Sequence, residues 1–228
     1  MGPFGSAFSL CFASKTSKAS RSSEIPRFDA VVIVGGGIGL PSALSALREF
    51  IRRRKSGKAV PSHVFFVWQC RHPEEVTLCW ESLHRAIFYD GLQQSGEGDL
   101  PLPLDGWDAS SAMLGWLGVA VYVSRPSAAM ETLKARNPLG NDSDTALKSR
   151  VHEWFAHPRR LREGYFEVDK ILVWLSQRAR QRTDCAVALS FCGGPTTFKS
   201  LKAQVARAKK HPLMRGGSVE LEFAADHQ

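Results

Sequence analysis

The chain lacks any apolar run long enough to cross a membrane. Its longest apolar stretches are far shorter than the ~20 residues that a spanning helix needs. Its composition is also unexceptional, because 43 % of the 228 residues are hydrophobic and 23 % are charged. These values are close to ordinary globular usage, so wholesale disorder is excluded and one large or two small domains are expected.

The chain also lacks the cysteine spacing of a zinc site. It has five cysteines, an odd number, and no two of them form a C-x-x-C pair. This pattern predicts reduced thiols in a cytosolic setting and argues against a structural metal.

Acidic residues are fewer than basic ones. The chain has 22 Asp and Glu and 30 Lys and Arg, so its net charge is +8. Such a charge favours anionic partners, namely nucleotide phosphates, nucleic acid or an acidic membrane face. Aromatic residues are not interleaved with a basic face, so we expect no nucleic-acid partner.

A glycine-rich stretch stands out within residues 31–41. The β-branched run Val31-Val32-Ile33-Val34 predicts a strand buried on both faces, and the four glycines between residues 35 and 39 predict a sharp turn. Pro41 suits the first turn of a following helix, whose free N–H groups form a ready phosphate site. The stretch is typical of a nucleotide-binding turn.

The turn does not satisfy the dinucleotide pattern G-x-G-x-x-G, because its spacing is Gly35-x-Gly37-x-Gly39 and Leu40 follows. Two alternatives stay open at this point. One is a glycine-rich turn that holds no ligand, and the other is a fold that binds a methyl donor.

Apolar runs and helical periodicity alternate along the rest of the chain. Further strands are predicted at 64–68, 117–124, 187–191 and 219–223, with helices after residue 40, after Pro73, over 166–180 and after Pro195. The fold class is therefore α/β, with a doubly wound, mainly parallel five-stranded sheet and helices on both faces. We predict a loop at about 91–111 as an insertion between core elements. Residues 126–164 are charged and predicted to be irregular, apart from a helix near 146–154.

Ligands of such sheets bind at the carboxyl ends of the strands, which directs attention to residues 35–39, 70–72, 124–125 and 192–195. The second strand ends in Gln69-Cys70-Arg71 without the acid that usually accepts ribose hydroxyls. Arg71 and Ser124-Arg125 instead suit a 2′-phosphate, which favours NADPH over NADH and weighs against a methyl donor. The alternative for each arginine is a surface ion pair with Glu74, Glu75 or another acid.

Residues 1–28 are rich in Ser, Gly, Ala and Lys and predict a flexible lead-in, with a targeting segment as the alternative. Residues 29–228 then form the ligand-binding domain. The basic cluster Arg52–Lys58 predicts a solvated helix end, and an anionic membrane or protein surface is its alternative partner.

Several segments, in order, carry a resemblance to a known family. They are Gly2-Pro3-Phe4-Gly5, residues 31–40, Val67-Trp68-Gln69-Cys70-Arg71, residues 121–125 and Phe191-Cys192-Gly193 with Pro195. Together they resemble the C-terminal NAD(P)H-binding domain of the ferric reductase and NADPH oxidase family, within the ferredoxin-reductase superfamily. The first segment is similar to the motif that closes the family's flavin domain.

The resemblance implies an NAD(P)H-dependent oxidoreductase in which NADPH lies across the strand ends and gives its hydride to FAD. It implies that Cys192, the expected catalytic residue, lies near the nicotinamide. The expected cofactor-binding residues are Gly35, Gly36, Gly37, Ile38, Gly39, Leu40, Pro41, Arg71, Ser124, Arg125, Gly193, Gly194 and Pro195.

The flavin barrel and haem-bearing membrane helices of the family are missing from this sequence. We therefore expect a fragment or stand-alone remnant that works with such domains in cis or in trans, at the cytosolic face of a membrane if it is part of a full-length reductase and otherwise in the cytoplasm. Residues 1–28 then include a remnant of the flavin-domain end. The alternatives are a catalytically silent interaction module that keeps the fold and a methyl-donor-binding transferase domain.

Overall fold

The computed structural model describes residues 5–15, 25–86, 116–127, 161–169, 185–210 and 219–227. The predicted loop at 91–111, the predicted helix near 146–154 and residues 170–180 lie outside this described part of the chain.

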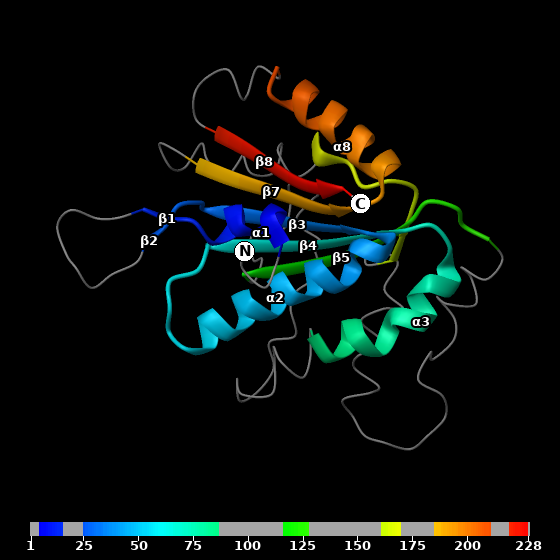
Figure 1. Ribbon diagram of the computed structural model, residues 1–228, viewed down its shortest axis with the longest axis horizontal. Coiled ribbons are helices and arrows are strands. Elements are labelled where there is room, and N and C mark those ends of the chain that lie inside the picture. The colour runs from blue at the N-terminus through cyan, green and yellow to red at the C-terminus, as the bar shows by residue number, and fades with distance from the viewer. Residues whose placement is uncertain are drawn as a thin grey trace, which may run out of the picture.

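A parallel sheet forms the centre of the molecule (Figure 1). Its described strands are β3 (Ala30–Gly36), β4 (His63–Cys70), β5 (Leu117–Val123), β6 (Leu161–Glu163), β7 (Cys185–Gly193) and β8 (Val219–His227). They follow the order β6-β5-β4-β3-β7-β8, and every neighbouring pair is parallel. All residues of β3 are buried, as its β-branched run predicts for a strand covered on both faces.

Helices cover both faces of the sheet, as the doubly wound prediction requires (Figure 1). On one face lie α2 (Leu40–Lys55) and α3 (Pro73–His84), and on the other lies α8 (Pro195–Ala208). The apolar stripe of α2 is buried against the first face, and Leu201 and Val205 of α8 are buried against the second. The α/β fold class predicted from the sequence is confirmed.

The sheet has six described strands rather than the predicted five. The additional strand, β6, is only three residues long, and it pairs with Val121–Val123 of β5. Of its residues only Leu161 is buried, while Arg162 and Glu163 are polar. So short and charged a segment has no apolar run that would mark it as a strand.

The N-terminal segment packs on the sheet where the sequence predicted a flexible lead-in. It contains α1 (Gly5–Ser9), the 3-10 helix η1 (Leu10–Phe12) and a small antiparallel pair, β1 (Ser14–Lys15) with β2 (Ile25–Pro26). Helix α1 contacts β7 and β8, and Phe8 and Cys11 are buried. Apolar side chains of residues 5–15 and 25–28 thus join the core. The lead-in over 1–28 and the division into domains stay predictions.

Candidate functional site

The order of the strands creates a crevice at the carboxyl edge of the sheet. The chain builds β3, β4, β5 and β6 outward in one direction and then returns to the other side of β3 with β7 and β8. The order thus reverses between β3 and β7, which is where ligands bind in open α/β sheets. These strand ends point toward the right-hand side of Figure 1.

A cavity of about 410 Å³ opens at this edge. Six segments contribute to its wall: the turn after β3, the ends of β4 and β5, the first turn of α3, the loop after β6 and the first turn of α8. The lining residues are Gly36, Gly37, Ile38, Gln69, Cys70, Arg71, His72, Glu75, Ser124, Tyr165, Gly194, Pro195, Thr196 and Thr197.

The glycine turn passes from β3 through the 3-10 turn η2 (Gly37–Gly39) into α2. Gly37 has a φ of +51°, a conformation that suits glycine. A Cβ added at Gly39 would lie 1.9 Å from the carbonyl oxygen of Cys192, so only a glycine lets the start of α2 approach the end of β7. The turn thus packs against the end of β7, so it contacts both strands that flank the point of reversal.

The structure brings together part of the predicted site. The predicted residues that line the cavity are Gly36, Gly37, Ile38, Arg71, Ser124, Gly194 and Pro195. The others lie behind or beside that wall, and they are Gly35, Gly39, Leu40, Pro41, Arg125, Cys192 and Gly193. For both groups of residues, contact with a cofactor stays a prediction.

The two predicted arginines lie on neighbouring strand ends. The backbone N–H of Arg125 donates to the carbonyl of Arg71 over 2.8 Å, and both side chains are exposed. Between them, Ser124 Oγ donates to the carbonyl of Cys70 over 3.2 Å. Among the described residues neither arginine side chain forms an ion pair, so the guanidinium groups are available to an anion.

Glu75 does not neutralise Arg71. Its carboxylate instead accepts hydrogen bonds from the backbone N–H groups of Arg71 and His72, over 3.0 and 2.9 Å. The backbone N–H of Glu75 in turn donates to the backbone carbonyl of His72, which closes the turn at the start of α3. The acid nearest to the cavity is therefore bound to backbone donors.

Sequence reasoning missed several residues of the wall. The most informative are Gln69, Tyr165, Thr196 and Thr197. Thr196 and Thr197 follow the predicted Gly-Gly-Pro segment directly, so extending that segment into the helix would have found them. Tyr165 had no such signal, because the short strand before it was not predicted.

Cys192 lies at the carboxyl end of β7, paired with Gly35 of β3. Its side chain is buried on the face of α2, and it is outside the cavity wall. Burial raises the pKa of the Cys192 thiol, the nearby charge of Asp226 raises it further, and a hydrogen bond with Ser42 opposes the rise. The side chain is thus a protonated thiol near neutral pH.

The other buried cysteines are protonated as well. Burial raises the pKa of Cys70 to about 12, and that of Cys11 also to about 12. No disulfide joins the five cysteines, all of which lie in the described ranges. In those same ranges no cluster of His, Cys, Asp and Glu could hold a metal ion.

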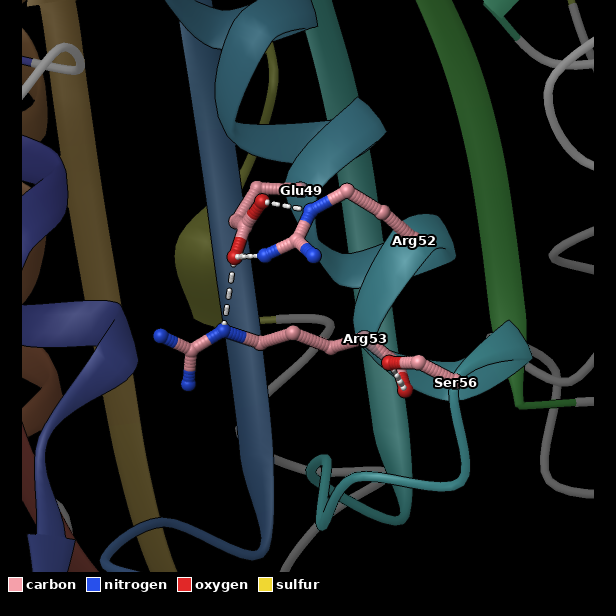
Figure 2. A network of polar contacts seen from close by, with 4 residues as sticks. All are labelled: Glu49, Arg52, Arg53 and Ser56. Carbon is pink, nitrogen blue, oxygen red and sulfur yellow. Dashed lines mark hydrogen bonds and ion pairs between the residues drawn. The ribbon is translucent and has the colours of Figure 1, made fainter.

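The basic end of α2 makes contacts within the chain. Arg52 and Arg53 both bind the carboxylate of Glu49, as Figure 2 shows, and they hold the pKa of that carboxyl below its usual value. The guanidinium of Arg53 also lies over the Phe12 ring, and that of Arg54 over the Trp116 ring. These contacts occupy three of the cations in the predicted basic cluster.

Across the described ranges, no helix combines the length and the apolar character that crossing a bilayer requires.

Fold and site together define a nucleotide-binding α/β domain, with a glycine turn and a basic strand end at the point where strand order reverses. Residues 28–94 match the model of the ferric reductase NAD binding domain family. The match confirms the resemblance to the NAD(P)H-binding domain of the ferric reductase family, an oxidoreductase family, and supports a nicotinamide nucleotide as cofactor. No curated protein matches the chain significantly.

The matched segment covers β3, α2, β4 and α3. It therefore includes the glycine turn and Arg71. Ser124, Arg125 and Cys192 lie beyond it, and they reach the same edge of the sheet through the strand order.

Proposed function

We propose that this chain is the NADPH-binding module of a ferric-reductase-like flavoprotein, which positions NADPH for hydride transfer to FAD and for onward electron transfer across a membrane. One observation carries the proposal. The glycine turn, Arg71, Ser124 and the start of α8 surround a single cavity at the reversal of strand order.

The glycine turn is the proposed site of the cofactor's pyrophosphate. Gly36 and Gly37 line the cavity without side chains, and α2 begins immediately after the turn. Free backbone N–H groups and the positive end of the helix dipole favour an anion there. Leu40 and Pro41 belong to the first turn of this helix and set its direction.

Ser124, Arg71 and Arg125 are the proposed partners of the 2′-phosphate. Two exposed guanidinium groups and a hydroxyl at neighbouring strand ends fit a dianion better than they fit a ribose hydroxyl. The strand end Gln69-Cys70-Arg71 carries no acid that could accept ribose hydroxyls, and the amide of Gln69 is bound to the backbone. These features favour NADPH over NADH.

The end of β7 is the proposed place of the nicotinamide. Bound NADPH supplies a hydride from this ring. Gly194 leaves the backbone open to a planar ring, because nothing lies within 4 Å of an added Cβ there, and Pro195 starts α8. Gly193 packs against the backbone of Gly36, and Cys192 lies behind them as a neutral thiol. These residues orient the ring, and FAD would come from a domain outside this chain.

Calorimetry tests the proposal. NADPH should bind saturably and more tightly than NADH, and Arg71→Ala and Arg125→Ala should each weaken NADPH binding about tenfold with little effect on NADH. Lys58→Ala is the matched control, because this exposed lysine lies just beyond the far end of α2.

Three results would count against the proposal. Absence of saturable NADPH binding at millimolar ligand would reject it. Preferential binding of a methyl donor would favour the transferase alternative. Unchanged NADPH affinity in both arginine variants would favour a silent interaction module.

The partners in this proposal are flavin-binding and haem-bearing membrane domains, and the location is the cytosolic face of a membrane. An anionic membrane surface would have to use Lys55 and Lys58, because Arg52, Arg53 and Arg54 have partners within the chain. Co-sedimentation with phosphatidylserine vesicles tests that contact. Equal sedimentation of wild type and a Lys55→Ala/Lys58→Ala variant would reject it.

A further inference from the structure

The loop after β6 carries the only tyrosine, phenylalanine or tryptophan among the described residues of the cavity wall. Phe166 of this loop and Val168, the first helical residue after it, are buried in the core on the face of α8. Tyr165, next to Phe166, is 55 % exposed and lines the cavity. The direction of Tyr165 therefore depends on how the backbone of residues 164–168 is held.

Gln69 holds this backbone from one side. Its side chain is 5 % exposed, and its Oε1 accepts from the N–H of Phe166 over 2.9 Å. Its Nε2 donates to the carbonyl of Gly164 over 3.1 Å and to that of Tyr122 over 3.3 Å. One amide thus ties the loop to the ends of β4 and β5.

Gln204 of α8 holds the same backbone from the other side. Its side chain is 8 % exposed, and its Oε1 accepts from the N–H of Val168 over 2.8 Å. Its Nε2 donates to the carbonyl of Phe166 over 3.2 Å and to Ser200 Oγ over 3.3 Å. The helix whose first turn lines the cavity therefore also fixes the loop that faces it.

A carboxamide can make both sets of contacts at neutral pH, whereas a carboxylate of the same length cannot. An irregular backbone presents N–H donors and carbonyl acceptors together, and a buried group must satisfy both kinds. A carboxylate accepts but cannot donate, whereas the amide of glutamine does both. The amide at the end of β4 is consequently used to hold the loop.

Building on the proposed function, we propose that Gln69 and Gln204 are positioning residues. Their paired amides hold Tyr165 as the aromatic wall against which a planar ring of the bound nucleotide packs. They act through Tyr165 and do not touch the nucleotide themselves.

A double-mutant cycle with NADPH as the probe tests this role. Gln69→Met and Gln204→Met keep the side-chain length but lose the amide, and each should weaken NADPH binding about tenfold, as should Tyr165→Ala. In the Tyr165→Ala background, neither glutamine change should weaken binding further. Ser200→Ala is the matched control, because it removes one partner of Gln204 and leaves both contacts with the loop.

Amide hydrogen exchange gives a second readout that involves no ligand. The amides of Phe166 and Val168 should be protected in the wild type and should exchange faster in Gln69→Met and Gln204→Met, while those of β3 stay unchanged. If a variant does not fold, exchange in the wild-type protein still tests the role. Unprotected amides at Phe166 and Val168 in the wild type would refute the positioning role.

The outcomes separate this inference from the proposed function. Absence of NADPH binding to the wild type overturns both. If the wild type binds NADPH while the glutamine changes weaken its affinity equally in the presence and absence of Tyr165, that result overturns only the positioning role. A glutamine variant with fast exchange but unchanged NADPH affinity also overturns it.

Discussion

At the scale of the residue, Gly39 has the strictest requirement in the glycine turn. An added Cβ would lie 1.9 Å from a backbone oxygen of β7, and a backbone atom cannot move aside as a flexible side chain can. The sequence placed this glycine in a cofactor-binding turn. The structure shows that its hydrogen faces the neighbouring strand.

Gly39→Ala should lower the free energy of unfolding by about 3 kcal/mol, the upper end of what overpacking costs. Urea denaturation measures this change. Gly194→Ala is the control, because nothing lies within 4 Å of its added Cβ, and it should cost less than about 1 kcal/mol. Equal losses in the two variants would contradict the close approach of the backbones.

The Cys11 thiol should make the stability of the protein depend on pH. Its Sγ donates to Ser190 Oγ over 3.0 Å, and burial raises the pKa of the thiol from 9.0 to about 12. Between these values the folded protein keeps a proton that the unfolded chain has released. Stability that depends on this thiol is therefore complete below pH 9 and is lost as the pH rises toward 12.

The wild type should thus lose about 1.5 kcal/mol of unfolding free energy, relative to Cys11→Ala, between about pH 9 and about pH 10.5. Denaturation curves of both proteins at each pH provide the measurement. Comparison with the variant cancels the titration of lysines and tyrosines. Parallel pH profiles would show that the Cys11 thiol is not held protonated.

At the scale of the element, the N-terminal segment behaves as part of the core. Phe8 of α1 is fully buried and Cys11 follows it into the same cluster, although the surrounding Ser, Gly and Lys residues suggest flexibility. Composition averages over a segment, whereas a single buried aromatic side chain is enough to dock it.

Phe8→Ala should destabilise the protein by about 3–4 kcal/mol, as is usual for removing a buried aromatic side chain. Ile25→Ala, at a position that is 48 % exposed in β2, should cost less than about 1 kcal/mol. Thermal unfolding followed by circular dichroism compares the two. A Phe8→Ala protein as stable as the wild type would favour the flexible lead-in that the composition predicts.

The elements differ in how far the sequence predicted them. Strand β3 and helix α2 were predicted from residues 31–51, because a long β-branched run and a regular apolar stripe each have one structural solution. Strand β6 was not predicted, because its existence depends on pairing with β5 rather than on its own residues.

At the scale of the whole molecule, the net charge of +8 bears on cofactor choice. NADPH carries one more phosphate than NADH, and the proposed partners of that phosphate are exposed arginines. Salt screens exposed charges over distances of about 10 Å at 0.1 M ionic strength. The preference for NADPH should therefore depend on salt.

Raising the salt concentration from about 50 to about 500 mM should reduce the ratio of NADPH to NADH affinity by about three- to tenfold. Calorimetric titration with each nucleotide at both salt concentrations measures this ratio. Arg71→Ala should show a weaker dependence than the wild type. A ratio that does not change with salt would remove the assignment of the 2′-phosphate to these arginines.

The sequence by itself determined the fold class, the glycine turn and the basic strand ends, because each follows from residues that are neighbours in the chain. Only the tertiary structure decided which of these residues share one cavity. It brought Tyr165 to the same edge as Gly37, and it placed Cys192 behind the wall. It also gave the buried amides of Gln69 and Gln204 a common loop. Contacts between residues far apart in the chain depend on strand order and on which face a side chain occupies, and a local pattern specifies neither.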